Sequence, residues 1–428
     1  MNDQPPLTRR EFIHSGLAVV STAATIPTFL HHSALVLAED GPSELIKDRP
    51  GVPSDRVLVV VQLSGGNDGL NTVVPFGQDD YYRARPRIAV KRDQVLAVDG
   101  GAGIGLHPQM TALKQMMDSG LASIVQGVGY PNPNRSHFAS MDVWHTGDTR
   151  GGKGRGWLGK ALDEVAPESA TAMIAIGNDA PLAGHGKRSR PVAFQNARVF
   201  RWVGSDLHEA LEDPYEKINR QLLGGEAADG DDQAAFIRRT ALNAQVASDR
   251  IRRAVNRGPQ TSFPGGQLAN QLKMVSAMIR AGLPTRVYYV GQGGYDTHAN
   301  QQGRHQGNLR QFSDATAAFY KELKAIGQDQ RVLTMAFSEF GRRVAENASG
   351  GTDHGAAGPL FLFGDMIRPG LLGSHPSLTR LDQGDLIYGV DFRSIYTSVL
   401  DQWLKADSAR VLGGSFKPAS VLDAKKIA

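Results

Sequence analysis

The stretch Val332-Leu333-Thr334-Met335-Ala336-Phe337 decides the fold, because it is an unbroken apolar run between polar segments. Such a run predicts a strand that is buried on both faces of a sheet. Glu339 lies at its carboxyl end, where parallel α/β sheets collect ligands and metals. Asp353 and His354 follow in a Gly-rich loop that can fold back over this end. Two carboxylates and an imidazole so placed can hold a divalent cation, although an ordinary polar surface loop explains them too.

Outward from this strand, helix and strand patterns alternate from residue 57 to 337, which predicts an α/β fold with a mostly parallel sheet and helices on both faces. Residues 205–258 have a helical pattern rich in Asp, Glu and Arg, and we expect a helical insertion there. Asp391 is the predicted N-cap of a last amphipathic helix. The main domain is therefore expected over residues 56–405, with a C-terminal tail over 406–428.

The first 38 residues are typical of a targeting segment and take no part in the fold. Thr8-Arg9-Arg10-Glu11-Phe12-Ile13 is a twin-arginine signature, and a short apolar stretch follows it. This stretch is only moderately apolar, so we expect a cleaved signal rather than a permanent membrane span. The pattern predicts export by the twin-arginine (Tat) translocase to the periplasm or the cell exterior. Residues 39–55 are polar and are expected to form a linker.

Composition excludes several classes of chemistry. The chain of 428 residues contains no cysteine, which rules out zinc–thiolate, iron–sulfur and thiol sites. Any metal must therefore be held by oxygen and imidazole ligands. The formal charge is only +4 and the basic residues are scattered, so no nucleic-acid partner is expected.

Four predicted strands end in loops that carry polar side chains, after Leu63, Val128, Val290 and Phe337. Because the connections of a parallel sheet are right-handed, these ends should share one edge. Each loop alone is a weak signal. Their convergence is the main sequence argument for a metal site.

The loops hold the candidate residues. Asp68 follows the first strand and is either a metal ligand or part of an ordinary Asx turn. Arg135 and Ser136 suggest a nucleophile beside an anion-binding group, or a helix N-cap at Ser136. Asp296 and His298 can bind one cation together, or form a polar turn.

The same motifs resemble a known family. The chain resembles the Tat-exported proteins grouped as domain of unknown function 1501, within the alkaline phosphatase-like superfamily that includes the sulfatases. The resemblance spans about residues 57–404 and depends on five motifs: Gly65-Gly66-Asn67-Asp68-Gly69-Leu70-Asn71, Asn134-Arg135-Ser136-His137-Phe138, Gly294-Tyr295-Asp296-Thr297-His298, Ser338-Glu339-Phe340-Gly341-Arg342-Arg343 and Gly351-Thr352-Asp353-His354-Gly355. It implies an alkaline phosphatase-like domain.

The resemblance also implies a ligand set. Asp68 would supply the metal-binding Asp of the first strand, and Ser136 the nucleophile. Asp296 and His298 would supply one metal site. The other site uses an Asp-His pair, for which Glu339 can replace the Asp whereas Phe340 cannot replace the His. His354 would then be the last His, or Asp353 and His354 would themselves be the Asp-His pair.

The expected function is an exported, metal-dependent hydrolase of a phosphate or sulfate ester. Its substrate would be a small molecule or a polysaccharide, and its cofactor one or two divalent ions from among Zn²⁺, Mn²⁺, Mg²⁺ and Ca²⁺. Arg135 would balance charge on the substrate oxygens. The alternative is a non-catalytic exported protein that binds a polysaccharide or a protein partner and keeps a reduced metal site, which Phe340 favours.

Overall fold

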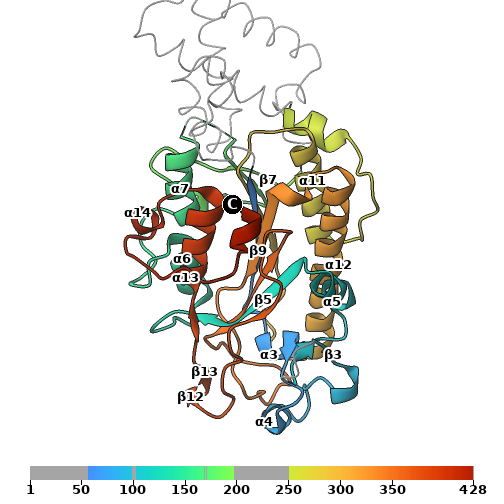
Figure 1. Cartoon of the computed structure of the whole chain (residues 1–428). Helices are drawn as coiled ribbons and strands as arrows, with labels where there is room; N and C mark the ends of the chain where they lie inside the picture. Colours follow the sequence, from blue (N-terminus) through green and yellow to red (C-terminus); the bar gives the residue numbers. More distant parts are fainter. Residues whose placement is uncertain (1–55, 99–102, 168, 170, 197–249, 428) are drawn as a thin grey trace, which may run out of the picture.

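Strand β1 (Val57–Leu63) lies at the centre of the fold. The computed structural model describes residues 56–98, 103–167, 169, 171–196 and 250–427 (Figure 1). The odd-numbered side chains of β1 belong to one hydrophobic core, whereas Leu58 and Val60 belong to another. Successive side chains of a strand point to opposite faces of the sheet. The unbroken apolar run of β1 therefore serves two cores at once.

β1 is part of a nine-stranded sheet with the order β11-β5-β10-β9-β1-β8-β6-β7, in which β14 also pairs with β5. The other strands are β5 (Ala122–Gly129), β6 (Met173–Ile176), β7 (Val192–Phe194), β8 (Val287–Gln292), β9 (Val332–Phe337), β10 (Gly358–Phe363), β11 (Gly370–Leu372) and β14 (Val390–Asp391). Among the described strands of this sheet, only β10 runs antiparallel to its neighbours, β5 and β9. The predicted mostly parallel sheet is confirmed.

Helices cover both faces of the sheet, as predicted (Figure 1). One core includes side chains of α5 (Thr111–Asp118), α11 (Gln267–Arg280) and α12 (Gln301–Ala325). The opposite core includes side chains of α6 (His137–Thr146), α7 (Trp157–Val165), α13 (Phe392–Ser398), the π-helical turn Val399–Leu404, α14 (Ser408–Leu412) and α15 (Ala424–Ile427). The predicted cap of α13 is confirmed, because Asp391 accepts a hydrogen bond from the backbone N–H of Arg393.

Smaller elements complete the fold, and several of them gather at the lower end of the sheet in Figure 1. They are α3 (Gly69–Thr72), α4 (Asp79–Ala84), the small sheet of β2 (Val73–Val74), β4 (Gly105–Leu106) and β3 (Leu96–Ala97), the hairpin of β12 (Leu381–Asp382) and β13 (Asp385–Leu386), and the 3-10 turns η1 (Arg92–Gln94), η2 (Leu182–Gly184) and η4 (Asp329–Arg331).

The four predicted strand ends do share one edge. β8 and β9 run parallel to β1. β5 has the same direction, because β10 runs antiparallel to both β5 and β9. The loops after β1 and β8 touch at this edge. Gly65 has a φ of +116°, and a Cβ there would lie 2.3 Å from the backbone nitrogen of Asp296, so only glycine allows this approach.

Part of the predicted domain organisation lies outside the described residues. This applies to the targeting segment, the linker and most of the helical insertion, of which residues 250–256 are described and helical. The predicted C-terminal tail contains α14 and α15, and Val421 and Leu422 between them are buried. None of the helices in the described ranges combines the length and apolar character that crossing a membrane requires.

A fully buried ion pair fixes the loop after β1. Arg85 Nη1 donates to Asp68 Oδ2 at 2.6 Å, and both side chains are 0% exposed. The same guanidinium donates through Nε and Nη2 to the carbonyl oxygens of Val344 and Arg343, both 2.8 Å away. Burial raises the pKa of Asp68, but the adjacent Arg85 outweighs this effect and keeps the pKa below its ordinary value.

Removing this carboxylate should destabilise the protein. We expect Asp68→Ala to lower the free energy of unfolding by about 3–5 kcal/mol, because Arg85 would keep a buried charge without a partner. Denaturant unfolding at neutral pH measures the loss. Asp79→Ala is the matched control, since its ion pair with Arg92 is exposed and should cost less than about 1 kcal/mol. Equal losses in the two variants would contradict the argument.

Candidate metal centre

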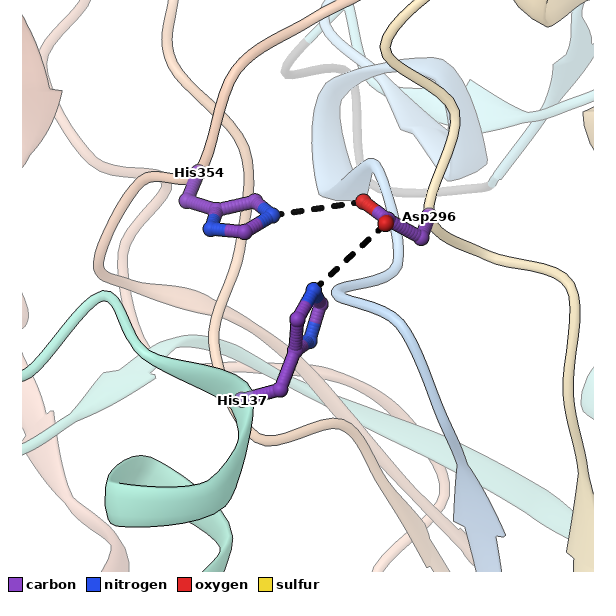
Figure 2. A group of neighbouring side chains, drawn as sticks. All are labelled: His137, Asp296 and His354. Carbon is purple, nitrogen blue, oxygen red and sulfur yellow. Dashed lines mark hydrogen bonds and ion pairs between the residues drawn. The ribbon is translucent and has the colours of Figure 1, made fainter.

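Three side chains from separate segments converge at the carboxyl edge of the sheet (Figure 2). His137 begins α6, Asp296 follows β8, and His354 lies in the loop between β9 and β10. His354 Nε2 is 3.2 Å from Asp296 Oδ1, and His137 Nε2 is 3.6 Å from Asp296 Oδ2. All three ligand atoms lie within 4.8 Å of one another. Two imidazoles and a carboxylate at this spacing fit a single divalent ion.

His298 extends this group. Its Nε2 atom lies 3.1 Å from Asp296 Oδ1 and 2.9 Å from His354 Nε2. The structure therefore brings together Asp296, His298 and His354, three of the six residues that the sequence suggests as metal ligands. The side chains of Asp296 and His298 are 48% and 44% exposed, so solvent and a substrate can reach the group.

Glu339 and Asp353 contact the far side of two of these imidazoles. Glu339 is 2% exposed, and its Oε1 lies 2.8 Å from His137 Nδ1 and accepts from the backbone N–H of Gly65 at 2.8 Å. Asp353 Oδ1 lies 3.1 Å from His298 Nδ1. Both predicted ligands are thus next to the group but bonded to nitrogens on its outer side. Their direct binding of a metal stays a prediction.

Arg342 holds Asp296 in place. Its side chain is 0% exposed, and its Nη2 donates to Asp296 Oδ1 at 2.7 Å. The other guanidinium nitrogens donate to carbonyl oxygens of Gly66 and Thr352. Burial raises the pKa of Asp296, but the hydrogen bond from Arg342 and the contact with His354 outweigh it and lower the pKa to about 2. Asp296 is therefore ionised at neutral pH, as metal binding requires.

His354 is held in a similar way from its other nitrogen. Nδ1 of this imidazole is 2.8 Å from the backbone carbonyl oxygen of Arg135. Burial lowers the pKa of His354, although its hydrogen bonds to Asp296 and Arg135 act in the opposite direction. The net shift favours the neutral imidazole, which is the form that binds metals.

Asp68 lies apart from this group. Its carboxylate is paired with Arg85 and also accepts a hydrogen bond from Gln301 Nε2. Oδ1 of Asp68 is buried without a hydrogen-bond partner. Gln301 Oε1 in turn accepts from the hydroxyls of Thr297 and Thr352, which adjoin the candidate ligands in sequence. Asp68 is thus connected to the site through the hydrogen bonds of Gln301. Its role as a metal ligand stays a prediction.

The two predicted catalytic residues precede His137. Ser136 is exposed and occupies the N-cap position of α6, but its side chain makes no cap hydrogen bond. Arg135 is paired with Asp385 of β13, through Nε at 2.8 Å and Nη2 at 2.5 Å. Burial raises the pKa of Asp385 even though Arg135 and Arg343 lie beside it. The catalytic roles of Ser136 and Arg135 are not tested by this geometry.

His137 is the site residue that sequence reasoning missed. The motif around Ser136 suggested a nucleophile, which made His137 a neighbour rather than a ligand. The structure places the ring of Phe340 beside His137 and His354, with ring centroids 5.0 and 4.7 Å apart. The structure thus places another imidazole, that of His137 at the start of α6, beside the ring of Phe340. The departure at Phe340 was the signal that could have prompted a search for it.

Structural comparison finds distant likenesses to several solved structures. Lipoteichoic acid synthase LtaP from Listeria monocytogenes is 8% identical over 80% of this chain and 72% of its own, with a TM-score of 0.35. An alkaline phosphatase superfamily protein from Vibrio parahaemolyticus is 10% identical over 83% and 74%, with a TM-score of 0.32. The sulfatase PsFucS1 from Pseudoalteromonas sp. is 13% identical over 91% and 72%, with a TM-score of 0.33. Scores this low carry no argument about activity.

Sequence comparison identifies the family of the protein. No curated protein matches the chain. A family model described as "Protein of unknown function (DUF1501)" matches residues 102–411, which include His137, Asp296, His298 and His354. The match covers most of the chain, and the protein therefore belongs to the DUF1501 family.

Proposed function

We propose that the protein is a divalent-metal-dependent hydrolase that acts on a phosphate or sulfate ester. The observation that supports this proposal is the convergence of His137, Asp296 and His354 on one point of the sheet edge. Catalytic metal sites use about three protein ligands and leave a position open, whereas structural sites are closed. The partial exposure of all three side chains fits the open kind of site.

The donor set narrows the choice of metal. Ca²⁺ and Mg²⁺ prefer oxygen ligands, whereas imidazole suits Zn²⁺ and other transition metals. His137 and His354 thus favour Zn²⁺ over the harder ions. When bound, such an ion would act as a Lewis acid on an oxygen of the ester. Asp296 would be the one negatively charged ligand of the three, and Arg342 would hold its carboxylate in place.

Ser136 is the proposed nucleophile. Its exposed hydroxyl makes no cap bond, and it directly precedes His137 in the chain. The substrate charge would have to be balanced mainly at the metal site, because Arg135 and Arg342 are both bonded to carboxylates of the protein. Arg135 would have to leave Asp385, or use its remaining nitrogen, to contact a substrate.

We also propose that the protein works in the periplasm or outside the cell after twin-arginine export, which the motif at Arg9 and Arg10 supports. An ester of a small molecule or of a polysaccharide would be met there. A non-catalytic binding protein is the alternative. It would bind the metal at the same residues and turn over no ester.

Metal-dependent turnover tests the proposal directly. Aryl phosphate and aryl sulfate esters should be hydrolysed slowly by protein loaded with Zn²⁺ or Mn²⁺, and chelation should stop the reaction. We expect Asp296→Ala to lower kcat/KM by about 100-fold or more, because a metal ligand is lost. Asp93→Ala, an exposed aspartate, is the control and should leave turnover unchanged. Metal binding without hydrolysis of any ester would favour the binding protein.

The variant Ser136→Ala distinguishes a nucleophilic role of Ser136 from a role as the N-cap of α6. If the hydroxyl attacks the ester, turnover should fall by about a thousandfold or more while metal content stays the same. Because the side chain makes no cap hydrogen bond, the free energy of unfolding should change by less than the ~1 kcal/mol that a lost cap costs. Full activity in this variant, measured with the same esters, would rule out Ser136 as the nucleophile.

A further inference from the structure

We propose that Glu339 and Asp353 are positioning residues, not metal ligands, and that they turn His137 and His298 so that the Nε2 atom of each imidazole faces Asp296 at the metal site. This inference rests on the metal site of the proposed function. It requires metal binding but no turnover. It therefore remains valid if the protein proves to be a binding protein, and fails separately if the metal is bound in another way.

The first step concerns His137. Glu339 Oε1 lies 2.8 Å from His137 Nδ1 and also accepts from the backbone N–H of Gly65. A proton on Nδ1 gives this pair a hydrogen bond and leaves Nε2 for a metal. Nε2 lies 3.6 Å from Asp296 Oδ2. The arrangement is the carboxylate–histidine pair that orients metal-binding imidazoles.

The second step repeats the arrangement on the other side of the site. Asp353 Oδ1 lies 3.1 Å from His298 Nδ1 and also accepts from Asn347 Nδ2 at 3.0 Å. In His354 the backbone carbonyl of Arg135 plays the same part at Nδ1. All three rings thus have an acceptor at Nδ1, and the Nε2 atom of each lies within 3.6 Å of an oxygen of Asp296.

The third step compares these distances with metal geometry. Two donors bound tetrahedrally to one ion, each at roughly 2.0–2.1 Å, lie about 3.3 Å apart. His298 Nε2, His354 Nε2 and Asp296 Oδ1 are separated by 2.9, 3.1 and 3.2 Å. The 2.9 Å contact between the two Nε2 atoms fits either a proton or a cation between them. One ion shared by these atoms matches the spacing.

The last step explains why Glu339 is not itself a ligand. Its side chain is 2% exposed, and its Oε1 already receives the Gly65 N–H and faces His137 Nδ1. Oε2 lies 3.1 Å from the hydroxyl of Ser338, which also donates to the carbonyl oxygen of Leu63 at 2.6 Å. Both oxygens thus contact groups of the protein. We therefore expect one metal ion per chain rather than two.

Metal titration of the full chain tests the assignment. Zn²⁺ should bind with a stoichiometry of one per chain, measured in competition with a chelator. Glu339→Gln keeps an acceptor oxygen but removes the charge, and Asp353→Ala removes the acceptor beside His298 at an exposed position. We expect each change to weaken Zn²⁺ binding about 10–100-fold. Glu164→Gln, placed on α7 beside Arg410, is the matched control and should bind as the wild type does.

Nitrogen NMR of protein labelled with ¹⁵N-histidine supplies the readout that a merely structural role would not move. In the wild type, Zn²⁺ should shift the Nε2 signals of His137 and His298 while their Nδ1–H signals remain. In Asp353→Ala the Nδ1–H signal of His298 should lose its hydrogen-bonded shift. Unchanged affinity in both variants, or two bound equivalents of which Glu339→Gln removes one, would overturn the proposal.

Discussion

The site depends on one buried cation, the guanidinium of Arg342. It donates to backbone carbonyls in three loops, those of Gly65 and Gly66 after β1, Tyr295 after β8 and Thr352 between β9 and β10, and to the carboxylate of Asp296. A fully buried arginine is costly to desolvate unless its donors are satisfied. The three loops must therefore turn their carbonyl oxygens toward the Arg342 guanidinium. This arrangement places the candidate ligands side by side.

A second polar layer lies behind the first. Gln301 at the start of α12 connects the buried carboxylate of Asp68 with the hydroxyls of Thr297 and Thr352. These two threonines adjoin Asp296 and Asp353 in sequence. The ion pair of Asp68 with Arg85 thus reaches the metal centre through hydrogen bonds rather than through a shared ion.

Sequence reasoning could predict the sheet and its functional edge because both depend on local patterns. The apolar run of β1 and the glycines after it required no knowledge of distant residues. The partners of the site residues could not be predicted in the same way. Arg85 lies 17 residues from Asp68 in an irregular segment, and Glu339 lies 202 residues from His137. Such pairs form only when the fold is complete, so the sequence could not show that Glu339 contacts His137.

The antiparallel strand β10 has a consequence for how the site can vary. Because β10 returns directly beside β9, the loop that carries Arg342, Asp353 and His354 begins and ends at the same edge, without a crossover helix. Insertions or deletions in this loop would reshape the centre while the strand order and both hydrophobic cores stay intact. The sheet and its two cores can thus stay the same while this loop changes. Specificity can therefore vary here with little effect on the stability of the fold.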